Sequence, residues 1–246
     1  MRLRLPPGFA GVRVVGDVHG EARAFEAAVE GAAERRLFTV QLGDLTDHGP
    51  DAPAVLAMMF GLIDRGAGLF LLGNHDHKLR RALSGQAMRV DEDGLGATLA
   101  QLKAHPDGEA LAARAIAEIA RAPAWVGFGP VTLFVHGGFH PSMLASPPPA
   151  DAGTQRPEGA IARALFGQTA RGAVTAAGYP VRVLGWVDAI PAGLTVYCGH
   201  DTRSTDGRPH IRRGKAGGRA VFMDTGAGKG GHLSWCDLGV DGEEAT

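Results

Sequence analysis

Three short apolar segments in the first eighty residues each end in glycine, and side chains that bind metal ions follow directly. The three glycine-led sequences are Gly16-Asp17-Val18-His19-Gly20, Gly43-Asp44-Leu45-Thr46-Asp47 and Gly73-Asn74-His75-Asp76. Carboxyl ends of neighbouring parallel strands meet at one edge of a sheet, so carboxylate, imidazole and amide groups are expected side by side there. This combination predicts a metal-dependent hydrolase.

Two later apolar segments end in the same way. Residues 131–135 run into His136-Gly137-Gly138, and residues 194–198 run into Gly199-His200. Together the five segments offer oxygen and nitrogen ligands without thiolates, a set that suits Mn²⁺, Fe or Zn²⁺ better than a structural cysteine-rich zinc site. The set is large enough for two metals if one carboxylate bridges them.

The elements that must position these residues alternate between strand and helix. Strands are expected at residues 11–15, 37–42 and 69–72, and helices at 21–36 and 51–64. Near-continuous apolar strands separated by helices predict a parallel sheet covered on both faces. Function in such sheets gathers at the carboxyl ends of the strands, which are the ends that carry the ligand side chains.

The remainder of the chain predicts fewer chemical features. Residues 78–121 are expected to form a helical lobe beside the site, and the proline-rich residues 141–157 a flexible loop. Residues 220–223 and 232–238 are interpreted as a final strand pair. The glycine-rich residues 226–231 between them lack the spacing of a phosphate-binding loop, so a hairpin turn is predicted.

Size and composition bound the possible functions. The chain has 246 residues, 45% of them hydrophobic and 21% charged, and we expect a single domain over residues 1–246 with a polar tail at 241–246. A formal net charge of −1 gives no general attraction to long nucleic acid or to an anionic membrane. Cys198 and Cys236 lie in apolar segments and are expected to be buried, reduced thiols. No apolar segment resembles a signal peptide or a membrane span, so a soluble, cytoplasmic protein is expected.

In their order along the chain, these motifs resemble those of calcineurin-like metallophosphoesterases, and within that family the phosphoprotein-phosphatase branch. The resemblance extends roughly from residue 14 to residue 224. The stretch from Gly73 to Arg80, together with Leu165-Phe166-Gly167-Gln168 and Gly185-Trp186, is similar to the phosphatase module of bacterial polynucleotide kinase-phosphatases. The resemblance implies a mixed-sheet α/β sandwich with helices on its outer faces and the metal site at the carboxyl ends of the strands.

The resemblance also implies a role for each matching position. Asp17 and His19 would hold the first metal, Asp44 would bridge, and the ligands of the second metal would be His136, His200 and Asn74. A further pair would donate a proton to the leaving group, with His75 as the general acid and Asp47 orienting it. Asp224 matches a position that lines the substrate site.

His48 departs from the pattern of the family. The branch that the chain resembles has arginine at this position, where it forms a bidentate clamp on phosphate. Histidine is shorter and only partly charged near neutral pH, so His48 is a candidate substrate-binding residue that would hold phosphate less firmly than arginine. Other basic residues that could replace the clamp are Arg80, Arg81, Arg182 and Arg203.

These features predict a dimetal-dependent enzyme that hydrolyses phosphate monoesters through a metal-bridging hydroxide, a class that includes serine/threonine protein phosphatases. Mn²⁺ is the first choice of metal, with Fe, Zn²⁺ or Ni as alternatives. Expected substrates are a phosphorylated small molecule, a nucleotide or a phosphoprotein. One alternative is a phosphohydrolase of nucleotides, RNA ends or dinucleoside polyphosphates. Another is a metal-binding sensor or scaffold whose catalysis has been weakened by His48.

Overall fold

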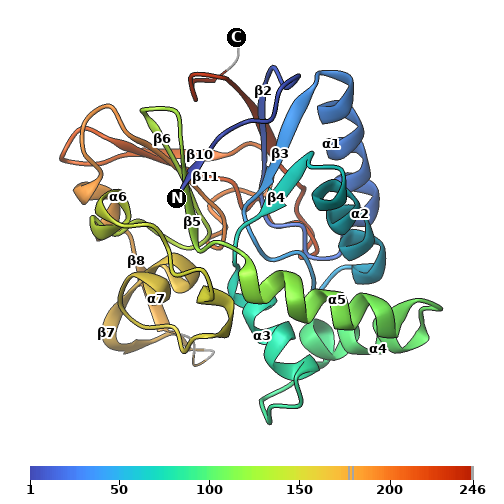
Figure 1. Ribbon diagram of the computed structural model, residues 1–246. Coiled ribbons are helices and arrows are strands. Elements are labelled where there is room, and N and C mark those ends of the chain that lie inside the picture. Colours follow the sequence, from blue (N-terminus) through green and yellow to red (C-terminus); the bar gives the residue numbers. More distant parts are fainter. Residues whose placement is uncertain (177, 179, 245–246) are drawn as a thin grey trace.

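The computed structural model describes residues 1–176, 178 and 180–244. It is a mixed α/β structure in which a four-stranded and a six-stranded sheet pack face to face, beside a small two-stranded sheet. Figure 1 shows the two larger sheets side by side, with most helices at one side and below. The fold class predicted from the sequence is therefore confirmed.

The four-stranded sheet has the order β12-β2-β3-β4 and carries the first three motifs. Strands β2, β3 and β4 are parallel, while β12 pairs antiparallel with β2. Helices α1 and α2 cover its outer face (Figure 1). The bounds are β2 Gly11–Val15, α1 Ala22–Glu34, β3 Leu37–Gln41, α2 Ala52–Asp64, β4 Gly68–Phe70 and β12 Trp235–Gly239.

The expected helix starts and stops in this half agree with the structure. Asp51 caps α2 by accepting a hydrogen bond from the backbone N–H of Ala54, 3.0 Å away. Pro53 fits the first turn because the backbone N–H that it lacks would have no partner there. Gly66, just beyond α2, has φ 62°, a left-handed conformation that glycine adopts without steric cost.

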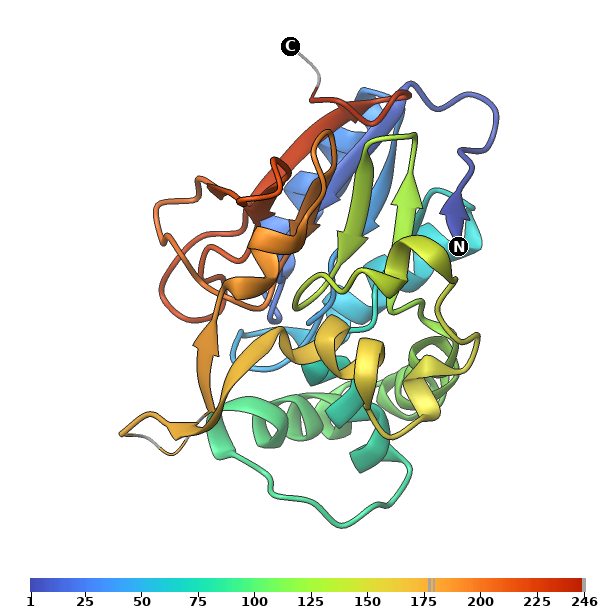
Figure 2. The ribbon, with the colours of Figure 1, turned by 90° about the vertical axis from the view of Figure 1, so that its left-hand side faces the viewer.

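The six-stranded sheet has the order β1-β5-β6-β9-β11-β10 and carries the last two motifs. The parallel neighbours β6 and β9 end in the segments that hold His136 and His200. Figure 2 shows β6, the green arrow that points down, directed toward the yellow and orange segments, while β1 and β5 point the other way. The bounds are β1 Arg2–Leu3, β5 Trp125–Phe128, β6 Thr132–Val135, β9 Thr195–Cys198, β10 His210–Arg213 and β11 Arg219–Phe222.

Apolar side chains from both sheets form the core between them. Alternate residues of each strand point inward, as the two-residue period of a strand requires. Burying these side chains fixes the distance between the sheets, and thus between the ligand groups at their ends. The inward-facing set includes Val12, Val14, Phe38, Val40, Phe134, Tyr197, Val221 and Leu238.

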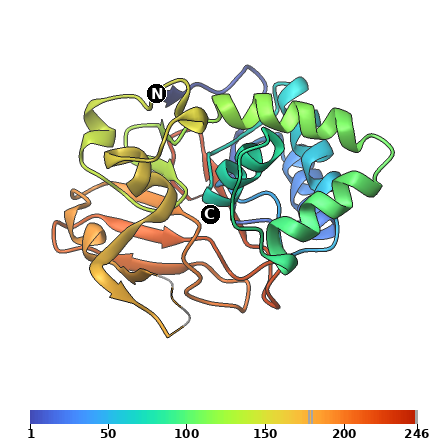
Figure 3. The ribbon, with the colours of Figure 1, turned by 90° about the horizontal axis from the view of Figure 1, so that it is seen from below.

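A helical lobe lies below the strand ends, as predicted for residues 78–121, but it begins earlier, at Asn74. Seen from below, its green helices lie over the half of the molecule that holds α1 and α2 (Figure 3). The yellow and orange segments lie over the other half. The lobe comprises α3 Asn74–Leu83, η1 Glu92–Gly96, α4 Ala97–Ala104 and α5 Gly108–Arg121.

Residues 141–157, predicted as a flexible loop, contain two short helices. They are α6 Ser142–Ala145 and η2 Ala152–Thr154. The rest of this region was not predicted in detail and comprises α7 Gly159–Phe166, β7 Gln168–Val174, β8 Pro180–Val183 and η3 Gly185–Ala189. Strands β7 and β8 pair with each other as the separate two-stranded sheet.

The prediction of a final strand pair is wrong. β11 pairs with β9 and β10 in the six-stranded sheet, whereas β12 pairs with β2 in the other sheet. Residues 226–231 therefore cross from one sheet to the other instead of turning a hairpin. The crossing takes them past the ends of the strands that carry the ligand groups.

Two smaller expectations concern the thiols and the membrane. Cys198 is a buried free thiol, and Cys236 is a free thiol that is only partly buried. Among the described helices, none is both long and apolar enough to span a bilayer.

Candidate metal centre

Two groups of potential metal ligands meet at Asp44. One group is Asp17, His19 and Asp44, and the other is Asp44, His136 and His200; within each group the ligand atoms lie within 4.8 Å of one another. The first group comes from the four-stranded sheet, and the second joins Asp44 to residues of the six-stranded sheet. Asp44 is thus the residue common to both groups, as a bridging carboxylate must be.

The carboxylates are fixed by backbone hydrogen bonds. Asp17 accepts from the backbone N–H of His200, with 3.0 Å to Oδ2 and 3.2 Å to Oδ1. Oδ1 of Asp44 accepts from the backbone N–H of His75 at 2.8 Å, which leaves Oδ2 facing Nε2 of His136 at 3.3 Å. Gly199 permits the close approach, because a Cβ at this position would lie 1.9 Å from Oδ1 of Asp17.

Two of the histidines are oriented by main-chain carbonyls. Nδ1 of His19 donates to the carbonyl of Thr46 at 2.9 Å, and Nδ1 of His136 donates to that of Leu42 at 2.9 Å. In each ring Nε2 is then the nitrogen directed at the other ligand groups, the usual arrangement around metal-bound histidine. Asn74, at the N-terminus of α3, places Oδ1 3.1 Å from Nε2 of His136 and so joins the second group.

Buried charge in this centre favours a cation. Burial and the neighbouring carboxylates of Asp224 and Asp44 raise the pKa of Asp17 well above its ordinary value. Burial alone would lower the pKa of His136, but the carboxylates of Asp44 and Asp17 raise it to about 9. The buried carboxylates therefore favour a positive charge next to Asp44. The oxygen and nitrogen donor atoms of the two groups fit divalent metal ions.

His200 is suited to binding a metal as a neutral ring. Burial, together with the charges of His136 and Arg182, lowers its pKa well below the ordinary value. Burial also lowers the pKa of His19 well below the ordinary value. Both rings therefore have an unprotonated nitrogen available, which metal binding requires.

The predicted general acid and its orienting carboxylate are in contact. Nδ1 of His75 lies 2.6 Å from Oδ2 of Asp47. Burial would lower the pKa of His75, but Asp44 and the hydrogen bond to Asp47 raise it above the ordinary value. Asp47 is buried, and its Oδ1 accepts from the hydroxyl of Thr98 at 2.8 Å. This chain of contacts favours the protonated form of the imidazole at the edge of the ligand groups.

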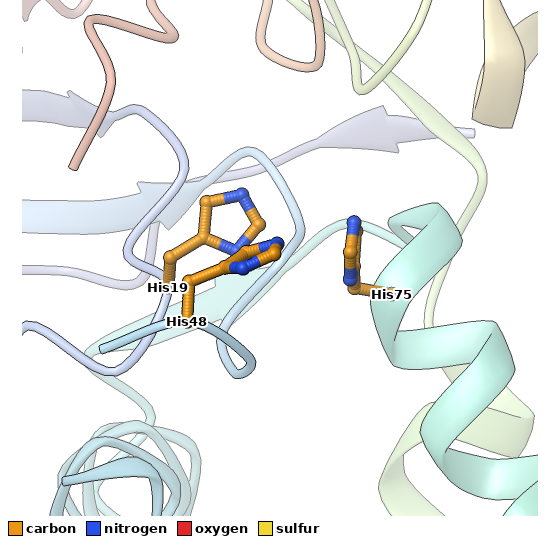
Figure 4. Close-up of side chains that lie close together, drawn as sticks. All are labelled: His19, His48 and His75. Carbon is orange, nitrogen blue, oxygen red and sulfur yellow. The ribbon is translucent and has the colours of Figure 1, made fainter. Parts of the chain in front are cut away.

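His48 lies over the first ligand group rather than away from it. Its ring centroid is 5.1 Å from that of His19 and 5.4 Å from that of His75 (Figure 4). Burial and the nearby charges of Lys229 and His75 lower the pKa of His48. The side chain therefore reaches the site, but as a largely neutral ring.

Asp224 is close to the site without facing solvent. It is buried, Oδ2 accepts from the hydroxyl of Thr202 at 2.7 Å, and Oδ1 accepts from the backbone N–H of Gly226 at 2.9 Å. These contacts anchor the start of the loop at residues 226–231. A direct contact between Asp224 and the substrate stays a prediction.

Many of the site residues share an unusual backbone conformation. A positive φ is uncommon for residues other than glycine and tends to mark functional sites. Among the described non-glycine residues, those with positive φ are His19, Arg36, Asp44, Asp47, His48 and His200. All but Arg36 are site residues predicted from the sequence.

Sequence reasoning gave no role to three residues that the structure brings to the centre. The buried carboxylate of Asp76 accepts from the backbone N–H groups of Gly73, Asp44 and Leu45, which positions the shared ligand. Thr98 supports Asp47 from α4. Lys229 places Nζ 2.9 Å from Nε2 of His19. For Asp76, its place within the third motif was the available signal.

The comparison with protein families gives a direct result. Residues 12–155, more than half of the chain, match the model of the calcineurin-like phosphoesterases. The chain belongs to this family. The matched part of this phosphoesterase contains the first four of its five ligand motifs, from Asp17 to His136.

Curated relatives of this phosphoesterase are bis(5'-nucleosyl)-tetraphosphatases of the asymmetrical type, named PrpE. The protein from Geobacillus thermodenitrificans is 33% identical over 110 residues, which cover 40% of this chain and 44% of the relative. The Bacillus subtilis protein is 31% identical over 100 residues, covering 37% and 41%. The match thus spans less than half the length of these relatives.

Solved structures with a similar fold cover more of the chain. A candidate diadenosine tetraphosphatase superposes with a TM-score of 0.57 at 23% identity, covering 95% of this chain and 91% of the other. A protein serine/threonine phosphatase from Saccharomyces cerevisiae gives 0.58 at 16% identity, covering 92% and 71%. At these identities the similarity shows the fold.

Proposed function

We propose that this phosphoesterase is a dimetal-dependent hydrolase of phosphate monoesters. The observation that carries the proposal is Asp44, which belongs to both ligand groups and whose two oxygens face different partners. Asp17 and His19 would hold one ion, and the ligands of the other would be Asn74, His136 and His200. Mn²⁺ is the first candidate, because oxygen and imidazole ligands without thiolate suit it.

Two bound metal ions would activate a water molecule and neutralise the charge of the phosphoryl group. The remaining chemistry belongs to this chain. A monoester leaving group departs as an alkoxide and needs a proton, which Nε2 of His75 is placed to donate. Asp47 holds Nδ1 of the same ring, so the donor keeps its orientation and its proton. Thr98 in turn fixes Asp47.

The test is turnover of an aryl phosphate by the purified protein with added Mn²⁺, together with metal analysis. The proposal expects turnover that depends on metal and up to two ions bound per chain. A protein that binds metal but turns over neither monoesters nor nucleotides would be a sensor or scaffold.

The comparisons favour a second candidate substrate. The curated relatives are named as asymmetrical bis(5'-nucleosyl)-tetraphosphatases, so a dinucleoside polyphosphate is the natural alternative to a monoester. Chromatography of the products from diadenosine tetraphosphate tests it, since asymmetrical cleavage leaves unequal nucleotides. A kcat/KM for diadenosine tetraphosphate well above the kcat/KM for aryl phosphate would favour the dinucleotide. The reverse would favour monoesters such as phosphoproteins.

A further inference from the structure

The loop at residues 226–231 lies beside the metal centre and is held in place by hydrogen bonds within the loop and at its base. The backbone N–H of Gly231 donates to the carbonyl of Gly226 at 2.9 Å, and that of Lys229 donates to the same carbonyl at 3.0 Å. The Thr225 hydroxyl closes the base of the loop by donating to the carbonyl of His232 at 2.6 Å. These bonds hold the loop in one shape as it crosses between the sheets.

The loop packs directly on the first ligand group. A Cβ at Gly228 would lie 2.8 Å from both Cβ and the carbonyl oxygen of His19, and 3.4 Å from the backbone nitrogen of Gly49. Gly228 also has φ 71°, which a glycine adopts without steric cost. This close backbone contact therefore places the next residue, Lys229, beside the centre.

Lys229 brings a cation to the first ligand group. The residue is exposed, yet its Nζ lies 2.9 Å from Nε2 of His19, the nitrogen that faces Asp17 and Asp44 at 3.9 Å. No carboxylate in the described part of the chain forms an ion pair with Lys229. By contrast, Lys215 has Asp188 as a partner. The ammonium group of Lys229 therefore retains hydrogen-bonding capacity for an anion.

Two arginines that were candidates to replace the clamp, Arg182 and Arg203, are already committed. Arg182 donates to the carbonyl of His200 at 2.6 Å and lies 3.5 Å from Asp201. Arg203 forms its ion pair with the same carboxylate. His48 contributes an imidazole rather than a permanent charge. Lys229 is the cation that the loop directs at the ligand atoms themselves.

We infer that Lys229 is a phosphate-binding residue that donates to a non-bridging oxygen of the reacting phosphoryl group. This inference rests on the proposed function, because a phosphoryl group at the metal centre is what Lys229 would contact. A lysine ammonium is a compact charge with three donors, so it can follow the oxygen as the phosphoryl group inverts. It thereby performs the task for which His48 is poorly suited.

The experiment compares Lys229→Ala, Lys229→Arg and the unmodified protein, with Lys215→Ala as control. Lys215 is also an exposed lysine, so its removal changes the net charge by the same amount. Its partner is Asp188, which is not part of either ligand group. We measure kcat/KM for an aryl phosphate, orthophosphate affinity of the Mn²⁺-loaded protein by calorimetry, and bound metal. Loss of a hydrogen bond to a charged group predicts that Lys229→Ala lowers kcat/KM and orthophosphate affinity by about 10–100-fold.

The expected pattern keeps bound metal unchanged in Lys229→Ala and restores most of the affinity in Lys229→Arg. Unchanged orthophosphate affinity in Lys229→Ala overturns the inference. So does a change confined to metal content or melting temperature, which would limit Lys229 to a structural contact with His19. A loss seen with diadenosine tetraphosphate but not with aryl phosphate would also overturn it, since the contact would then be to a phosphate that does not react.

The proposed function fails separately. If the unmodified, metal-loaded protein turns over neither substrate, the hydrolase proposal is wrong, while orthophosphate binding by the unmodified protein and by Lys229→Ala still decides whether Lys229 contacts phosphate. If the unmodified protein is active and Lys215→Ala has the same kcat/KM, a loss of kcat/KM in Lys229→Ala is caused by the position of Lys229 and not by the change in net charge.

Discussion

Nδ1 of His75 lies 2.6 Å from Oδ2 of Asp47, and this contact fixes which nitrogen of the ring can face a substrate. His75→Asn should keep the metals and lower kcat by about 10²–10⁴-fold for substrates with poor leaving groups, because it removes the proton donor. Aryl esters with good leaving groups need less protonation and should lose less. Steady-state kinetics on an alkyl and an aryl phosphate measure the difference.

Asp47→Asn is the companion variant, because it keeps the size of the side chain and removes the charge next to the ring. Its effect should follow the same dependence on leaving group, with a smaller loss. If His75→Asn slows alkyl and aryl phosphates equally, His75 is not the proton donor.

Asp44→Asn should remove the bridge between the two ligand groups. Asp44 belongs to both groups, and its neighbouring imidazoles of His136 and His75 hold its pKa well below the ordinary value against the effect of burial. An amide has no charge to offer two cations, so at least one ion per chain and nearly all turnover should be lost. Metal analysis after reconstitution with Mn²⁺ measures the stoichiometry, and Asp64→Asn, an exposed carboxylate outside the centre, is the control.

A buried ion pair joins two neighbouring strands of the four-stranded sheet. Arg13 on β2 contacts Asp237 on β12 through Nε at 2.7 Å and Nη2 at 2.8 Å, and both side chains are at least nine-tenths buried. Arg13→Met leaves a buried carboxylate without its main partner and should lower the free energy of unfolding by about 3 kcal/mol. Arg35 also contacts Asp237, but its side chain is 65% exposed, so Arg35→Met should cost under about 1 kcal/mol.

The same pair gives a pH dependence of stability. Burial opposes ionisation of Asp237, but hydrogen bonds and charge from Arg13 and Arg35 hold its pKa below the ordinary value. A lowered folded-state pKa means that the stabilisation is complete above the unfolded value of about 3.9 and is lost as the pH falls through the folded value. Urea unfolding from pH 7 to pH 3 should show Arg13→Met losing less stability on acidification than the unmodified protein. Equal losses would show that the pair does not contribute.

Local sequence patterns were sufficient for the first half of the fold. The β-α-β-α-β order was readable because residues 11–72 alternate short apolar strands with helices that have clear caps, such as Asp51. The clustering of the candidate ligand residues could be predicted because each follows a strand, and parallel strands bring such positions together. Their clustering needed no knowledge of distant contacts.

Contacts between distant segments could not be read in the same way. Residues 220–223 and 232–238 look like a hairpin because a short glycine-rich segment separates them, yet each strand satisfies its hydrogen bonds in a different sheet. Lys229 meets His19 across 210 positions in sequence, and Thr98 meets Asp47 across 51. Neither has a local spacing that distinguishes it from a surface residue.

His48 lies beside His19 and His75, and its contribution can be separated from that of Lys229. Its φ of 65° is a left-handed conformation that asparagine tolerates, so His48→Asn removes the ring with little backbone strain. Burial and nearby positive charge lower the pKa of His48 below about 6.5, so the ring should be neutral at pH 7–8. His48→Asn should therefore change KM for an aryl monoester by less than about threefold at pH 8.

His48→Arg tests the opposite change, because it adds a permanent cation beside the same ligand atoms. A guanidinium binds two phosphate oxygens at once, so KM should fall for a doubly charged aryl monoester more than for a singly charged diester. The measurement is kcat/KM for both esters from pH 6 to pH 8, with melting temperatures to confirm folding. An unchanged ratio of monoester to diester would mean that position 48 does not face the phosphate. The histidine would then be a turn residue, and the phosphate contact would fall to Lys229.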